Sequence, residues 1–163
     1  MQELEVINGR LGGHNITLAG FRALAGARKK ISICEIGCGG GDNLKAIARY
    51  AGKEGISLDI TGIDIKKECI EFAKTNSNLP ADTKWICSDY RLALLSRKPD
   101  IIFTSLFCHH FDDEGVVEII RWMKSNAKSG FFINDLHRHP LAYYSIKFLT
   151  SLFSKSYLVK HDA

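Results

Sequence analysis

The feature that most constrains this 163-residue chain is a glycine cluster between an apolar run and a helical pattern. The run 31–36 is apolar enough for a buried strand, and it leads directly into Gly37, Gly39, Gly40 and Gly41. Glycine inside a regular element costs roughly 0.5–1 kcal/mol relative to alanine. A cluster this dense therefore indicates a bend at which something needs bare backbone.

Apolar and β-branched runs alternate with helical patterns along most of the chain. We expect strands at 31–36, 57–63, 84–87, 100–105 and 130–135. Helices are expected from Asp42 or Asn43, either of which could cap, to about 51, and at 66–75, 113–126 and 141–153, with a helical turn or short helix at 91–95. This alternation predicts an α/β fold, with a mainly parallel sheet and helices on both faces.

Composition narrows the class of protein. Lys and Arg number 22 against 18 Asp and Glu, and this scattered net charge of +4 gives no indication of a nucleic-acid partner. The five cysteines form no CxxC pair and no zinc spacing, so we expect no metal, a reducing environment and a cytoplasmic location. No run of about 18 apolar residues is present, so no membrane span is expected.

Strand, glycine turn and helix form the arrangement with which open parallel sheets bind nucleotides at their carboxyl edge. The dinucleotide fingerprint is G-x-G-x-x-G, with a pyrophosphate at the start of the helix. Here the spacing is Gly37-x-Gly39-x-Gly41, and Asp42 stands where the third glycine would be. An acidic side chain is an unfavourable neighbour for a pyrophosphate, so the motif favours a ligand that is not polyanionic.

Three ordered motifs carry a family resemblance. Glu35-Ile-Gly37-Cys-Gly39-Gly-Gly41 resembles the E/D-x-G-x-G-x-G signature of class I S-adenosylmethionine-dependent methyltransferases. The stretch 61–65 resembles that family's second strand, whose terminal acid, here Asp64, accepts hydrogen bonds from ribose hydroxyls. The stretch 85–90 resembles the end of its third strand, where an Asp holds the adenine amino group and the next side chain packs on the ring.

The resemblance implies a Rossmann-like S-adenosylmethionine-binding domain over 31–163. Before it, two helical patterns joined at Gly12-Gly13 predict an N-terminal helical cap over 1–30 that covers the carboxyl edge of the sheet. The family's sheet ends in an antiparallel hairpin, which this chain is expected not to complete, because few residues follow Leu158-Val159. The expected cofactor is S-adenosylmethionine, and the implied binding residues are Glu35, Gly37, Cys38, Gly39, Gly41, Asp64, Ile65, Asp89, Tyr90 and Ser105.

Histidines follow two of the predicted strands at the edge where this family places its substrate. His110 is the first candidate for a catalytic base, with His137 and His139 second and His109 ranked below His110. Imidazole suits proton transfer near neutral pH. The loop resembles that of small-molecule methyltransferases of the ubiquinone and menaquinone biosynthesis type, which implies methyl transfer to O or C of a small metabolite.

Several alternatives stay open. The glycines could form a ligand-free turn, Glu35 could bond backbone amides, Asp64 could cap the following helix, and the histidines could be solvated loop residues. The chain could be a non-catalytic adenosyl-ligand binder or interaction module, or an NAD-dependent oxidoreductase. The apolar face of the helix 141–153 is expected to pack on the sheet, and contact with a membrane or an apolar substrate is the alternative. Where the missing hairpin leaves this face uncovered, a homodimer is expected.

Overall fold

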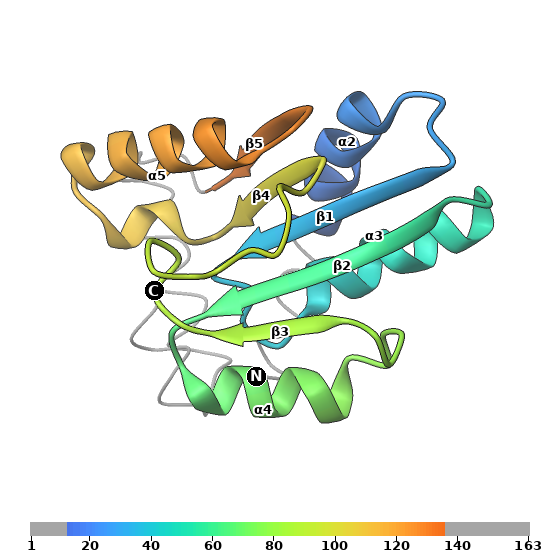
Figure 1. Ribbon diagram of the computed structural model, residues 1–163, viewed down its shortest axis with the longest axis horizontal. Helices are drawn as coiled ribbons and strands as arrows, with labels where there is room; N and C mark the ends of the chain where they lie inside the picture. Colours follow the sequence, from blue (N-terminus) through green and yellow to red (C-terminus); the bar gives the residue numbers. More distant parts are fainter. Residues whose placement is uncertain (1–12, 136–163) are drawn as a thin grey trace, which may run out of the picture.

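The computed structural model describes residues 13–135, which form one parallel sheet flanked by helices (Figure 1). The sheet has five strands in the order β3-β2-β1-β4-β5. The strands are β1 (Lys30–Ile36), β2 (Ser57–Asp64), β3 (Lys84–Cys87), β4 (Ile101–Ser105) and β5 (Gly130–Asn134). Every described pairing is parallel, so the carboxyl ends of all five strands meet at one edge.

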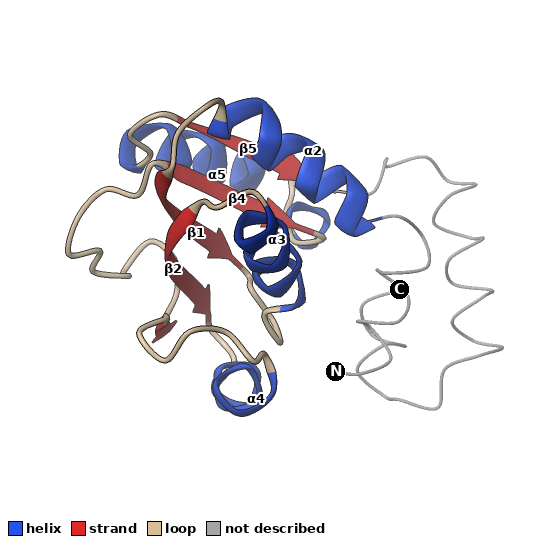
Figure 2. Ribbon diagram, turned by 90° about the vertical axis from the view of Figure 1, so that its right-hand side faces the viewer, coloured by secondary structure: helices blue, strands red, loops and turns tan. Residues whose placement is uncertain are grey.

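Helices cover both faces of this sheet (Figure 2). They are α2 (Gly13–Ala25), α3 (Asp42–Lys53), α4 (Lys67–Asn76) and α5 (Asp113–Asn126), with a short 3₁₀ turn η1 (Cys108–His110). The helices α2, α3 and α4 share one hydrophobic cluster with the sheet, and α5 packs into the cluster on the opposite face. The expected α/β architecture is confirmed.

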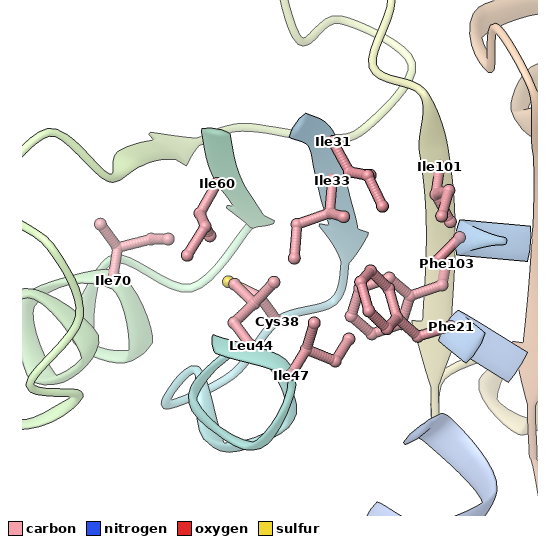
Figure 3. Packing of buried hydrophobic residues seen from close by; sticks show 11 residues of the cluster. Phe21, Ile31, Ile33, Cys38, Leu44, Ile47, Ile60, Ile70, Ile101 and Phe103 are labelled. Carbon is pink, nitrogen blue, oxygen red and sulfur yellow. The ribbon is translucent and has the colours of Figure 1, made fainter. Parts of the chain in front are cut away.

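Alternation along the strands builds the two cores. In β1, Ile31 and Ile33 enter the cluster under α3 (Figure 3), whereas Cys34 and Ile36 face the side of α5. All four side chains are at most 1% exposed, as expected for a strand covered on both faces. Full burial of one such isoleucine stabilises the fold by about 1.5–3 kcal/mol.

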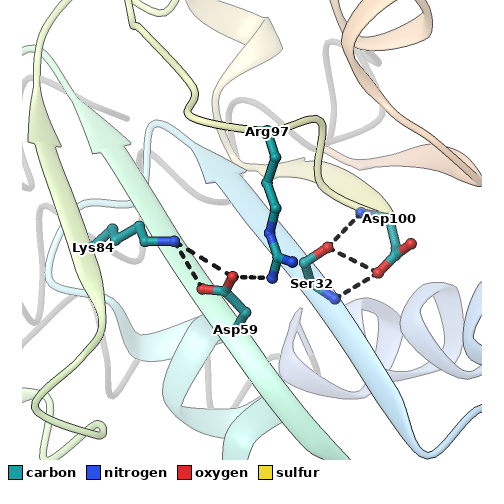
Figure 4. Close-up of polar contacts among 5 residues, drawn as sticks. All are labelled: Ser32, Asp59, Lys84, Arg97 and Asp100. Carbon is teal, nitrogen blue, oxygen red and sulfur yellow. Dashed lines mark hydrogen bonds and ion pairs between the residues drawn. The ribbon is translucent and has the colours of Figure 1, made fainter.

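At the amino ends of the strands, polar groups hold the sheet together (Figure 4). The Asp100 carboxylate accepts hydrogen bonds from the backbone N–H and the hydroxyl of Ser32, each at 2.8 Å. Asp59 accepts from Lys84 at 3.2 Å and is also paired with Arg97. These contacts join β1 to β4 and β2 to β3 on the side opposite the glycine bend.

Two details differ from the sequence expectations. Residues 91–95 form a backbone turn and irregular chain instead of a helix. Asp42 is the first residue of α3 and not its cap, because Gly41 occupies the cap position in the left-handed conformation. Residues 1–12 of the expected cap, the expected helix at 141–153, the incomplete hairpin and the homodimer lie outside the described residues.

The helix α2 lies on the face of the sheet beside α3, and its first residues, Gly13 and His14, contact Asn134 and Asp42 at the carboxyl edge. Its Phe21 is fully buried, and a Cβ on Gly20 would come within 2.6 Å of Phe132 in β5. The described part of the expected N-terminal cap is therefore part of the core. Among residues 13–135, none of the helices has the length and apolar character that crossing a membrane would require.

Candidate functional site

The glycine bend joins β1 to α3 at the carboxyl edge of the sheet. Gly37, Gly39 and Gly41 all have positive φ, at 66°, 51° and 77°. A Cβ on Gly37 would lie 2.4 Å from the Phe107 ring, so the loop after β4 rests directly on bare backbone. A Cβ on Gly39 would meet nothing within 4 Å, so this position faces open space.

Asp64, at the end of β2, holds the bend from the neighbouring strand. One carboxylate oxygen accepts from the Gly39 N–H at 2.8 Å, and the other accepts from the Lys66 N–H at 2.8 Å. Lys66, not Asp64, is the cap residue of α4. A carboxylate has about four acceptor positions, so Asp64 keeps acceptor capacity for a ligand hydroxyl beside Gly39.

Glu35 lies beneath the bend and is 1% exposed. Its Oε1 accepts from the Asn43 side-chain amide at 3.1 Å, whereas its Oε2 has no hydrogen-bond partner in the described chain. Burial raises the pKa of Glu35 well above its ordinary value, nearby Asp42 and Asp64 raise it further, and the Asn43 hydrogen bond partly offsets these effects. A positively charged or hydrogen-donating group bound here would relieve this unfavourable arrangement.

A buried chain of hydrogen bonds links Glu35 to the ends of β4 and β5. Thr17 donates to Asn43 at 3.3 Å, and Asn134 donates to Thr17 at 3.0 Å and to Ser105 at 3.2 Å. Asn134 also donates to the backbone carbonyl of Gly13 at the start of α2. This chain fixes three strand ends and α2 relative to one another.

Asp42, the first residue of α3, also contacts a residue of α2. The Asp42 carboxylate lies 3.1 Å from His14 Nε2. Together with Glu35 and Asp64, Asp42 makes three carboxyl groups around the bend. Such a setting repels pyrophosphate and attracts cationic ligands.

The residues expected around an adenine ring differ in how accessible their side chains are. Ile65 is 67% exposed beside Asp64, so its side chain is accessible to an apolar ring. Asp89 pairs with Arg91, which donates to it at 3.0 Å from Nε and 2.6 Å from Nη2, and these hydrogen bonds lower the pKa of Asp89. Tyr90 is 5% exposed and packs edge-on against Trp122, with ring centroids 5.5 Å apart.

Two other expected binding residues are also buried. The Cys38 thiol packs in the core near Gly62, and burial, with a further effect of Glu35, raises its pKa well above the ordinary value. Side-chain contact with a ligand is therefore restricted at Cys38 and Tyr90. Ser105 lies in the chain of hydrogen bonds described above and is 7% exposed.

The histidine loop follows β4 through Leu106, a non-glycine residue with a φ of 52°. His109 Nδ1 lies 2.8 Å from Asp135 Oδ1, and the other oxygen of Asp135 accepts from the backbone N–H groups of Phe107 and His109. His110 is exposed, with its ring centroid 4.1 Å from that of His109. His137 and His139 lie outside the described residues.

Sequence reasoning missed two features of this edge. The pairing of His109 with Asp135 joins residues 26 positions apart on neighbouring strand ends, and the Asn43–Thr17–Asn134 chain joins three separate elements. The polar pair Asn134-Asp135 after an apolar run was the one visible signal of both. It shows that this strand end is polar, and it does not show which partner each side chain takes.

Comparisons with known proteins agree with this geometry. Residues 33–130 match the family described as methyltransferase domain. The mitochondrial ubiquinone biosynthesis O-methyltransferase of Saccharomyces cerevisiae is 26% identical over 129 residues, which cover 75% of this chain and 39% of that protein. The chain thus spans about two fifths of the length of this curated relative.

Two solved structures share the fold. Magnesium protoporphyrin IX methyltransferase from Synechocystis PCC 6803, solved with bound SAH, has a TM-score of 0.63 at 17% identity, covering 89% of this chain and 65% of that one. The YcgJ protein from Bacillus subtilis has a TM-score of 0.58 at 21% identity, covering 85% and 59%.

Proposed function

Because the chain belongs to the methyltransferase domain family, we propose that it binds S-adenosylmethionine at the glycine bend and transfers the methyl group to O or C of a small molecule. When bound, this cofactor supplies a methyl group activated by a sulfonium. The name of the yeast relative, an O-methyltransferase of ubiquinone biosynthesis, supports a small acceptor. The resemblance in the three motifs supports the same cofactor.

The observation that carries the proposal is the carboxyl-rich bend with one open backbone position. Gly39 faces open space, and Asp64 beside it retains acceptor capacity for ribose hydroxyls. Below it lies Oε2 of Glu35, which has no hydrogen-bond partner among residues 13–135. S-adenosylmethionine carries positive charge on sulfur and on its amino group, so it matches this setting better than a dinucleotide does.

The remaining binding residues take supporting roles in this proposal. Ile65 packs against the adenine, and the backbone of Gly37, Cys38 and Gly41 shapes the bend. Asp89 and Tyr90 line the adenine end, with Asp89 sharing its acceptor positions between the ligand and Arg91. Ser105 holds the end of β4 beside the acceptor.

The chain's own task in the reaction is to orient the acceptor and exclude water, for which correct placement alone can supply roughly 7–11 kcal/mol of the barrier. A base is also needed where the acceptor must lose a proton. His110 remains the base predicted from the sequence, with His137 and His139 as second candidates.

Calorimetric titration with S-adenosylmethionine tests the cofactor. The D64N variant should bind about 5- to 150-fold more weakly than the parent, since a hydrogen bond to a charged group contributes roughly 1–3 kcal/mol. The exposed-turn variant D82N serves as the matched control and should bind like the parent. Equal affinity of D64N and parent, or tighter binding of NADH than of S-adenosylmethionine, would contradict the proposal.

A further inference from the structure

We propose that His109, rather than His110, takes the proton from the acceptor, and that Asp135 is the residue that positions it. The acceptor class assigned with this role is a compound with a phenol-like hydroxyl. This inference rests on the proposed function, because it concerns the acceptor side of the same site.

The first support is the way in which Asp135 fixes both the loop and the ring. Its Oδ2 accepts from the backbone N–H groups of Phe107 and His109 at 3.2 and 3.1 Å, and its Oδ1 lies 2.8 Å from His109 Nδ1. The two side chains are 20% and 12% exposed, so water competes little for this contact. An aspartate acceptor favours the tautomer that carries its proton on Nδ1 and a lone pair on Nε2.

The second support is the state of Nε2 itself. This ring nitrogen is buried and has no hydrogen-bond partner in the described part of the chain. A buried polar atom without a partner is costly, and the cost is removed when a donor reaches it. With Nδ1 holding the proton, the group that satisfies Nε2 is an O–H or N–H donor.

The third support is the location of this loop. His109 lines a cavity of about 390 Å³ together with Cys108, Asp113, Val116 and Asp135. This volume lies at the small end of the range for ligand pockets. Because Phe107 of the same loop contacts Gly37, the cavity belongs to the strand edge that also carries the bend.

The ordinary pKa of imidazole favours an acceptor with a phenol-like hydroxyl. Imidazole ordinarily titrates near 6.5 and phenols near 10, a gap that a positioned base can bridge. During transfer the hydroxyl proton moves to Nε2 of His109, the oxygen bonds the methyl carbon, and the electron pair of the broken C–S bond stays on sulfur. His110 is exposed to solvent, whereas Nε2 of His109 is buried.

The tautomer can be measured without any substrate. In ¹⁵N-histidine-labelled full-length protein at pH 8, long-range NMR spectra, assigned with H109Q, should show His109 protonated on Nδ1. The D135N variant should shift the proton toward Nε2, because an amide N–H₂ offers a donor to Nδ1, and D82N should leave the tautomer unchanged. An Nε2-protonated ring in the parent would overturn the proposal.

Activity supplies the second readout, with catechol, 3,4-dihydroxybenzoate and 4-hydroxybenzoate as probe acceptors and S-adenosylhomocysteine release as the signal. H109Q should lower the rate about 10²- to 10⁴-fold, with the Kd for S-adenosylmethionine within threefold of the parent. A rate within threefold of the parent, a larger loss in H110Q than in H109Q, or turnover of none of the three phenols would overturn the inference. Failure of the parent to bind S-adenosylmethionine would instead overturn the proposed function itself.

Discussion

At the residue scale, Glu35 shows how the proposed binding role of a residue can oppose stability. Its carboxyl group is buried under the bend with one oxygen unpartnered in the described chain, and burial, followed by Asp42 and Asp64, raises its pKa. The unfolded chain therefore loses this proton at a lower pH than the folded chain does. As pH rises above the ordinary glutamic acid value of about 4.3, the free energy of unfolding falls.

The E35Q variant should remove this penalty. We expect its Tm to match that of the parent near pH 4 and to exceed it at pH 8, with a difference that grows as pH rises. Its affinity for S-adenosylmethionine should fall, because the cation loses a nearby carboxylate. Calorimetric scans from pH 4 to 8 check the first point, with exposed E54Q as control, and a lower Tm for E35Q at pH 8 would contradict it.

At the element scale, the loops after β1 and β4 form one unit. Phe107 fills the space that a Gly37 side chain would need, and the positive φ of Leu106 turns the chain toward this contact. A bulky residue in the left-handed region is uncommon and is found where the surrounding structure holds it in place. The bend and the histidine loop therefore position each other.

Alanine at two glycines of the bend should separate stability from binding. Both G37A and G39A place Ala at positive φ, which costs roughly 1–2 kcal/mol. G37A should be destabilised by about 1–3 kcal/mol more, because its Cβ would lie 2.4 Å from Phe107. G39A should fold but bind S-adenosylmethionine at least tenfold more weakly, since its methyl group enters the open space.

Urea unfolding and calorimetric titration check this pair of variants. G39A binding at parental affinity would mean that the ligand does not approach this backbone. Equal unfolding free energies for the two variants would mean that Phe107 moves aside at little cost.

Helices and strands could be predicted where residues close together in the sequence determine them. The helix α5 begins and ends as expected, because the Asp112 side chain caps it by accepting from the Gly115 N–H. The turn after β3 could not be predicted, because Leu92 and Leu94 suggest a helical face but remain exposed. The His109–Asp135 contact is not local, since strand order decides which loops meet, and a single sequence gives that order only by resemblance.

At the scale of the whole molecule, one edge of the sheet carries contacts that stabilise the fold, and the other carries the proposed binding site. The amino edge carries ion pairs and hydrogen bonds that join strands (Figure 4), whereas the carboxyl edge carries the glycine bend (Figure 1) and the cavity beside His109. Partial burial raises the pKa of Asp59, but hydrogen bonds from Arg97 and Lys84 outweigh it, so its pKa lies below the ordinary value. At Asp100, burial likewise raises the pKa, but the hydrogen bonds from the backbone and side chain of Ser32 outweigh it, so this pKa also lies below the ordinary value.

Acid should therefore weaken the fold through its amino edge. A lowered folded-state pKa contributes stability that is present above the unfolded value of about 3.9 and is lost as pH falls through the folded value. We expect the free energy of unfolding in urea to fall between pH 4 and 2, and less steeply in D59N than in the parent. D82N should follow the parent curve, and a D59N curve as steep as the parent's would contradict the assignment.

The central place of β1 has a consequence for synthesis on the ribosome. Ile33 pairs with Ile60 on one side and with Ile101 on the other, and the residue that packs on Gly37 is Phe107. At about 5–20 residues per second, translation supplies that partner on the order of several seconds after the glycines have emerged. The nascent chain therefore carries the glycine bend for several seconds before the residue that packs on it has been made.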